Sequence, residues 1–126
     1  MDLIVRGMCG LLPNPARHGD RLRIRSVIGD YLEHSRIYRF AGPEGAEIYA
    51  GSADLMERNL DRRVEVLFPL EDREVRRKVD EILAALLADT SNAWELKPDG
   101  AWERIADTGT SSFETLRQVA LAASQA

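Results

Sequence analysis

One amphipathic segment, residues 72–88, limits most strongly what this chain can fold into. Its apolar side chains recur at helical spacing, at Val75, Val79, Ile82, Leu83, Leu86 and Leu87. This spacing predicts a helix that buries one face and exposes the other. Much of the chain before it consists of short apolar or alternating runs of strand length. We therefore expect the helix to cover one face of a sheet, which places the chain in the α/β class.

The other periodic segments predict strands and hairpins. We expect strands at residues 3–5, 36–40, 47–51 and 64–68, a turn at residues 42–45, and a second hairpin over residues 94–105. The tryptophans of that second hairpin, Trp94 and Trp102, are expected to pack rather than to stack on a ligand. Residues 27–33 are expected to form a short helix with Ser26 as its N-cap.

The length and composition fit one soluble domain. The 126 residues are 44% hydrophobic and 30% charged, and no run approaches the ~20 apolar residues of a membrane span. Ser111 and Glu114 form a capping box for a final helix, and the polar residues 107–110 before it resemble a linker. We therefore expect a single lobe over residues 1–106, followed by a linker and an appended helix over residues 107–126.

The net charge and the distribution of arginine limit the classes of function that the chain can have. A net charge of −4 argues against a general nucleic-acid binder. The first 40 residues nevertheless hold seven Arg against four acidic residues. This excess of Arg fits either phosphate recognition or GC-rich codon usage. Because Cys9 is the only cysteine and residues 1–6 do not form a leader peptide, we expect a cytoplasmic protein with a structural Cys9.

Two short motifs carry the chemistry. His34 and Arg36 follow the predicted helix, and Ser52 lies in a Gly-Ser-x-Asp turn that follows the strand paired with residues 36–40. A histidine that exchanges protons near neutral pH, a bidentate guanidinium and a hydroxyl donor could converge on one anion. This set suits phosphoryl transfer. The alternative is that His34 only caps the C-terminus of a helix.

These motifs resemble half of a phospholipase D-type active site. That pattern has His-x-Lys, then four residues and an Asp, a Gly-Ser-x-Asn turn, and an acidic residue about eleven positions after the turn, where Glu65 falls. Arg36 replaces the Lys and Ala41 occupies the place of the Asp. The chain is therefore not an intact lipase or nuclease half-site.

Both departures are typical of the bacterial type-1 polyphosphate kinase branch of this superfamily. The resemblance runs in order through residues 4–9, 25–29, 32–38, 49–56 and 58–69. It covers about residues 3–105 and implies the second, C-terminal phospholipase D-like domain of such a kinase, with a mixed sheet flanked by helices. It thereby implies transfer of the terminal phosphoryl group of ATP, reversibly, to polyphosphate.

The resemblance also implies roles for individual residues. Arg6 corresponds to an arginine that contacts ATP phosphates, and His34 lies opposite a phosphorylated histidine of the preceding domain. Glu65 would orient that histidine through its ring N–H. The implied catalytic residues are His34 and Glu65, and the implied ATP- and phosphate-binding residues are Arg6, His34, Arg36, Ser52, Asn59 and Arg63.

Other parts of the implied enzyme lie outside this sequence. ATP and ADP are substrates, and Mg²⁺ is held mainly by the preceding domain, so no metal site is expected here. The expected partners are polyphosphate, ATP and the upstream domains, in an enzyme expected to be a homo-oligomer. The isolated chain is expected to be an inactive segment of that enzyme.

Two other interpretations remain open. The chain could bind phosphate or polyphosphate without catalysis, as a regulatory module. It could also be a divergent phospholipase D-type phosphodiesterase that assembles two copies of His34 by dimerising, although the substitutions at Arg36 and Ala41 argue against this.

Overall fold

Two compact units make up the described part of the chain. The computed structural model describes residues 1–7, 9–43 and 45–125. Unit 1 comprises Met1–Glu33 and Ile82–Ala126, and unit 2 comprises His34–Glu81. Met8 of the N-terminal motif, Glu44 of the predicted turn and Ala126 of the final segment lie outside the described residues.

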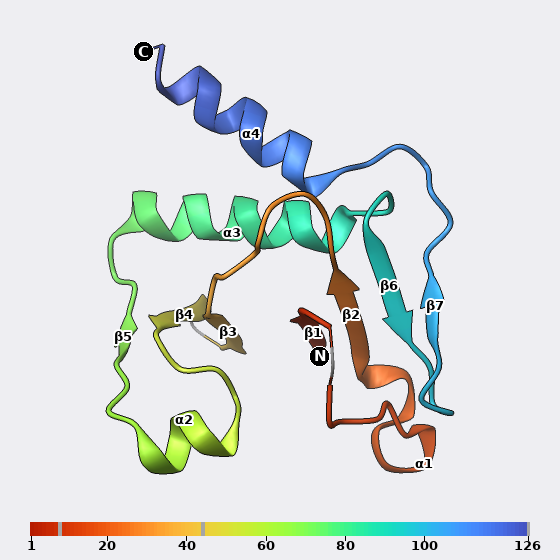
Figure 1. Ribbon diagram of the computed structural model, residues 1–126. Coiled ribbons are helices and arrows are strands. Elements are labelled where there is room, and N and C mark those ends of the chain that lie inside the picture. Colours follow the sequence, from red (N-terminus) through yellow and green to blue (C-terminus); the bar gives the residue numbers. More distant parts are fainter. Residues whose placement is uncertain (8, 44, 126) are drawn as a thin grey trace. The chain divides into compact units, whose positions relative to one another are not determined.

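Unit 1 is built on a four-stranded mixed sheet in the order β1-β2-β6-β7 (Figure 1). Its strands are β1 (Asp2–Val5), β2 (Arg23–Val27), β6 (Ala93–Leu96) and β7 (Trp102–Arg104). β1 pairs with β2 in parallel, and the other pairs are antiparallel. A short helix α1 (Pro15–His18) and a 3₁₀ turn (Gly19–Arg21) lie in the crossover between the two parallel strands. The strand at residues 3–5 and the hairpin over residues 94–105 are thus confirmed.

Successive side chains along these strands point to opposite faces of the sheet, so the core is divided into two clusters, one on each face. One face carries Leu22, Ile24 and Leu96, against which Cys9 and Trp102 pack. The other face carries a second cluster, Val27, Leu86 and Ala93, with Ile4, Ile82, Ile105 and Phe113 packed against it. Ile82 and Leu86 come from helix α3 (Arg73–Ala88), so its second half covers this face as the apolar spacing predicts.

Unit 2 contains a three-stranded antiparallel sheet in the order β3-β4-β5. The strands are β3 (Ile37–Gly42), β4 (Gly45–Gly51) and β5 (Leu67–Pro69), and helix α2 (Glu57–Arg62) lies between β4 and β5 in the chain. The β3–β4 hairpin confirms the predicted turn, with Gly42 opposite Gly45. The predicted strand at residues 64–68 is displaced, because Val66 bonds to Ser52 outside the ladder and β5 begins only at Leu67.

The first half of α3 belongs to unit 2. Asp72 caps it by accepting hydrogen bonds from the backbone N–H groups of Glu74 and Val75, both at 2.9 Å. Arg39 of β3 donates to Asp80 at 2.8 Å, and Arg76 donates to the carbonyl oxygen of Ala46 in β4. Two side chains of the helix thus tie it to this sheet.

The predicted helix at residues 27–33 is wrong. Val27 is the last residue of β2 and pairs with Ala93, and Ile28 N–H donates to the Asn92 carbonyl at 3.0 Å. The chain then passes so close to Phe113 that a Cβ on Gly29 would lie 2.3 Å from its ring. Sheet pairing and this packing outweigh the local helical pattern.

Helix α4 (Ser112–Ala123) is capped by Ser111, whose side chain accepts from Glu114 N–H as the capping box predicts. Its first turn is anchored in unit 1, since Ser112 is buried and Phe113 packs against the second cluster. In Figure 1 the C-terminal end of α4 leads away from the four-stranded sheet. Among the helices that the structure describes, none has the length and apolar character needed to cross a bilayer.

Candidate functional site

Ser52 fastens the end of β4 to the segment before β5. Its N–H donates to the Val66 carbonyl and its hydroxyl oxygen accepts from Val66 N–H, both at 3.0 Å. The approach is close, because a Cβ on Gly51 would lie 2.8 Å from the Val66 carbonyl oxygen. The Gly-Ser pair therefore lets two backbones meet here, and the Ser52 hydroxyl hydrogen is left to donate to Glu65.

Glu65 is the centre of a hydrogen-bonded group. Its Oε2 accepts from the Ser52 hydroxyl, and its Oε1 accepts from Asn59 Nδ2 at 3.1 Å and lies 3.4 Å from Arg63 Nε. The side chain is only 12% exposed. The Ser52 hydroxyl, then the Asn59 amide and the charge of Arg63 lower the pKa of Glu65 and keep its carboxylate ionised, against the opposing effect of burial.

Arg36 forms a second group with Asp54 and His34. Its Nε donates to Asp54 Oδ1 at 2.8 Å, and its terminal nitrogens lie 3.0 and 3.3 Å from the two ring nitrogens of His34. Because a guanidinium only donates, at most the one basic nitrogen of a neutral imidazole can accept from it. The hydrogen bond from Arg36 lowers the pKa of Asp54 and holds this carboxylate ionised.

The backbone brings this second group beside the Gly-Ser turn. Gly51 N–H donates to the Arg36 carbonyl at 3.0 Å, and the Tyr38 hydroxyl donates to the Ala53 carbonyl at 3.0 Å. His34 is exposed, whereas the Arg36 side chain is 19% exposed. Unit 2 therefore contains most of the predicted site: His34, Arg36, Ser52, Asn59, Arg63 and Glu65.

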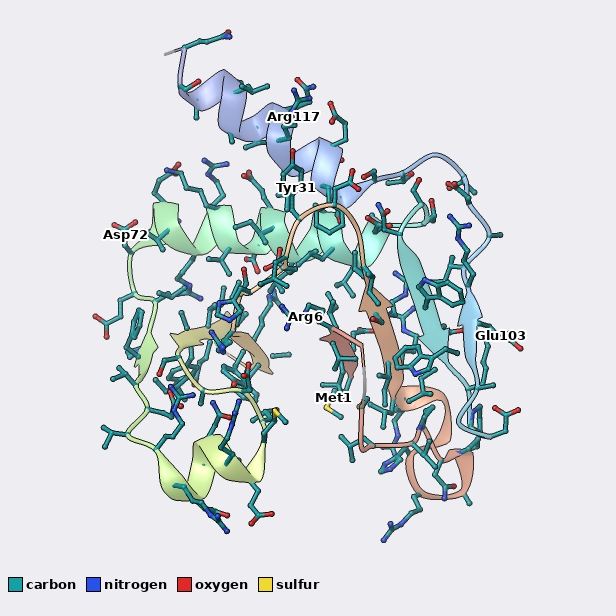
Figure 2. All side chains as sticks on the ribbon, in the orientation of Figure 1. Met1, Arg6, Tyr31, Asp72, Glu103 and Arg117 are labelled. Carbon is teal, nitrogen blue, oxygen red and sulfur yellow. The ribbon has the colours of Figure 1, made fainter. Side chains whose placement is uncertain are left out.

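Arg6 belongs to unit 1. It is exposed and follows β1 directly, as its label in Figure 2 shows. The backbone turns at Gly7, whose φ is +81° and whose N–H donates to the Ser26 hydroxyl at 3.0 Å. Its position at a strand end agrees with the sequence, and its approach to the residues of unit 2 stays a prediction.

Two features of the site were not foreseen from the sequence. Asp54 was recognised as part of the Gly-Ser-x-Asp turn but not as the partner of Arg36, although opposite charges on paired segments are a readable signal. Asn59 was expected among the ATP- and phosphate-binding residues, and it is buried at 1% exposure behind Glu65. No sequence signal distinguishes a buried Asn on so short a helix from an exposed one.

The fold as a whole matches a solved structure. The crystal structure of polyphosphate kinase from Porphyromonas gingivalis superposes with a TM-score of 0.88 and 29% sequence identity, over 98% of this chain and 19% of that one. The predicted class, a mixed α/β fold of the phospholipase D-like type, is thereby confirmed.

Sequence comparison agrees with the structural match. The family described as polyphosphate kinase C-terminal domain 2 matches residues 1–115. The chain is 50% identical over 102 residues to the polyphosphate kinase of a Synechocystis strain, covering 81% of this chain and 14% of that protein. It is 45% identical over 109 residues to that of Pseudomonas aeruginosa, covering 86% and 16%. The chain belongs to the polyphosphate kinase family, as a C-terminal domain that spans only 14–17% of the length of such curated relatives.

Proposed function

We propose that this chain is the C-terminal catalytic segment of an enzyme that transfers the terminal phosphoryl group of ATP, reversibly, to polyphosphate. The observation that carries the proposal is the pairing of His34 with Arg36 beside the Gly-Ser turn, within a domain of this family. Asp54 engages Nε of Arg36 and leaves the terminal nitrogens facing the imidazole. A phosphate oxygen arriving there could accept from the guanidinium and the ring together.

Phosphoryl transfer asks mainly for positioned positive charge. The transferred group spreads negative charge over three oxygens, and preorganised donors stabilise it without reorganising. We propose that His34, Arg36, Ser52 and Arg63 supply this chain's donors, and that Arg6 contacts the ATP phosphates. In this scheme His34 binds phosphate and carries a proton, and Glu65 orients a histidine supplied by the preceding domain.

In this scheme Mg²⁺ is bound by residues outside this chain. Over the described residues, no three His, Cys, Asp or Glu side chains gather as a metal ion would require. The donor set here suits an anion, and no step is assigned to Mg²⁺ on this chain. We propose that the preceding domain holds both Mg²⁺ and the phosphorylated histidine, in a cytoplasmic homo-oligomeric enzyme, and that the isolated chain does not turn over ATP.

The test is His34→Ala in the complete polyphosphate kinase that contains this segment. Loss of a positioned proton-transfer group costs about 10²–10⁴-fold in rate, so we expect polyphosphate synthesis from ATP to fall at least about a hundredfold. The thermal midpoint should stay within a few degrees, because residues 27–33 form no helix that His34 could cap and His34 is exposed. Substitutions at such exposed positions usually change stability by no more than about 0.5 kcal/mol.

Arg62→Ala is the matched control. Arg62 is a cation whose side chain is 75% exposed and lies 3.8 Å from Glu57. Its replacement should leave activity nearly unchanged. Retention of most activity by His34→Ala, or an equal loss in Arg62→Ala, would show that the site is misplaced.

A further inference from the structure

Asn59 stands out as a buried polar side chain with a single hydrogen bond. It lies on α2 with 1% exposure, and its side chain donates to Glu65 Oε1 at 3.1 Å. The orientation of the amide is fixed by chemistry, since a carboxylate only accepts and must therefore face the NH₂ group. The link between α2 and the segment before β5 thus depends on this donor.

The other half of the amide is unsatisfied. Asn59 Oδ1 is buried, and the described residues offer it no hydrogen-bond partner. A buried acceptor without a partner is costly, and a leucine of similar size would avoid that cost. An amide at this position is therefore explained by what its NH₂ group does for Glu65. The free oxygen is also unsuited to phosphate, whose oxygens are acceptors themselves.

We infer that Asn59 is a positioning residue that holds the Glu65 carboxylate against Ser52, rather than a direct ligand of phosphate. Ser52 holds Oε2 from the end of β4, and Asn59 holds Oε1 from α2. Two donors on different elements fix the plane of the carboxylate, which a single donor would leave free to rotate. The inference rests on the proposed function for its catalytic consequence, because it acts through Glu65.

A double-mutant cycle in the complete enzyme tests the inference. The variants are Asn59→Leu, Glu65→Gln and both together. We expect Asn59→Leu to lower kcat for polyphosphate synthesis by about tenfold to a hundredfold, as loss of orienting partners commonly does. KM for ATP should change less than about threefold, because the residue does not touch the nucleotide. In the double variant, Asn59→Leu should cause no loss beyond that of Glu65→Gln.

The pH dependence of Asn59→Asp gives a readout that a merely structural role would not move. Glu65 is faced by Ser52, Asn59, Arg63 and, at longer range, Arg36. At higher pH an ionised aspartate would repel Glu65, whereas a protonated one can donate to it. The activity of Asn59→Asp relative to the parent should therefore rise as the pH falls from about 8 to about 6, while that of Asn59→Leu stays constant.

A measurement on the 126-residue chain separates this inference from the proposed function. The titration of Glu65, followed by carboxyl ¹³C NMR, should move to higher pH in Asn59→Leu and not in Asn14→Ala, which removes an exposed amide elsewhere. An unmoved titration, or activity losses that multiply in the double variant, overturns the inference. If Glu65→Gln keeps full activity while the Glu65 titration still shifts in Asn59→Leu, the proposed catalytic role of Glu65 is overturned and the positioning contact with Asn59 stands. Should Asn59→Leu fail to fold, Asn59→Asp carries the same comparison.

Discussion

At the scale of single residues, two arginines of the site, Arg36 and Arg63, each lie beside a carboxylate that does not neutralise them fully. Asp54 engages one edge of Arg36, and Glu65 lies 3.4 Å from an exposed Arg63. Such partners restrict the rotamers of the arginines and leave donors free for an anion. The carboxylates can serve in this way only while they are ionised, which both lowered pKa values ensure near neutral pH.

The ionisation of Glu65 also makes a prediction about stability. Its pKa is lowered in the folded state by Ser52, Asn59 and Arg63. The stabilisation is therefore fully present above the ordinary glutamate pKa of about 4.3, and it is lost as the pH falls through the lowered folded value. In thermal melts of the 126-residue chain, the parent should exceed Glu65→Gln most above about pH 5, and the gap should close on acidification.

A suitable control for that series is Glu57→Gln. The Glu57 side chain is 78% exposed and lies 3.8 Å from Arg62, so its replacement should leave the midpoint unchanged across the same pH range. A gap between parent and Glu65→Gln that widens as the pH falls would contradict the assigned direction of the pKa shift.

Residue spacing predicted the site unevenly, for physical reasons. His34, Arg36 and Ser52 were expected to converge because of their chemistry and their spacing in the sequence, and Glu65 was added by the resemblance to the phospholipase D-type pattern. The orientation of Asn59 was not found, because the face of a helix of six residues is set by its tertiary contacts rather than by periodicity. The contribution of Arg6 to the same site remains a prediction.

At the scale of elements, the corrections arise where pairing outweighs local preference. Residues 27–33 have helical spacing, but Val27 is the last residue of β2 and the residues after it lead away from that strand. The strand expected at residues 64–68 begins only at Leu67, because the segment before it is held by the contacts of Ser52 and Glu65. The long helix was predicted accurately because sixteen residues provide more than four turns of periodic signal. Arg76, which lies outside the apolar stripe of this helix, is nevertheless half-buried.

Arg76 is expected to contribute to stability as a tether between α3 and β4. Its guanidinium donates to the Ala46 carbonyl and it is half-buried, whereas Arg73 on the same helix is exposed. A hydrogen bond from a charged donor is worth about 1.5–3 kcal/mol when buried, so Arg76→Ala should cost about 1–2 kcal/mol. Urea denaturation of the 126-residue chain should show this loss, and Arg73→Ala should stay within about 0.5 kcal/mol of the parent. Equal urea midpoints for Arg76→Ala and Arg73→Ala would show that Arg76 does not stabilise the contact between α3 and β4.

At the scale of the whole molecule, the final segment is more firmly attached than its composition indicates. Residues 107–110 were expected to form a linker, yet Ser91 donates to Asp107 at 2.8 Å and the N–H groups of Thr90 and Ser91 both donate to the Thr110 carbonyl. Asp89, fully buried after α3, accepts from both the N–H and the hydroxyl of Ser112 at 2.7 and 2.6 Å. The family match likewise extends to residue 115. These contacts tie residues 107–112 to unit 1, and the boundary after residue 106 stays a proposal.

The two ends of α4 should differ accordingly in their effect on stability. Phe113 packs against the cluster of Val27, Leu86 and Ala93 and lies 6.1 Å from Tyr31, ring centroid to centroid. Figure 2 shows Tyr31 beside the start of the helix. Replacing a fully buried phenylalanine with alanine costs about 3–5 kcal/mol, so Phe113→Ala at this half-buried position should cost about 2–3 kcal/mol and lower the thermal midpoint by roughly 10 °C. Val119, further along α4, is 55% exposed, and Val119→Ala should shift the midpoint by less than about 2 °C. If the two substitutions in the 126-residue chain had equal effects, the first turn of α4 would not be part of the core of unit 1, and the whole segment from residue 107 would be the appendage that its sequence first indicated.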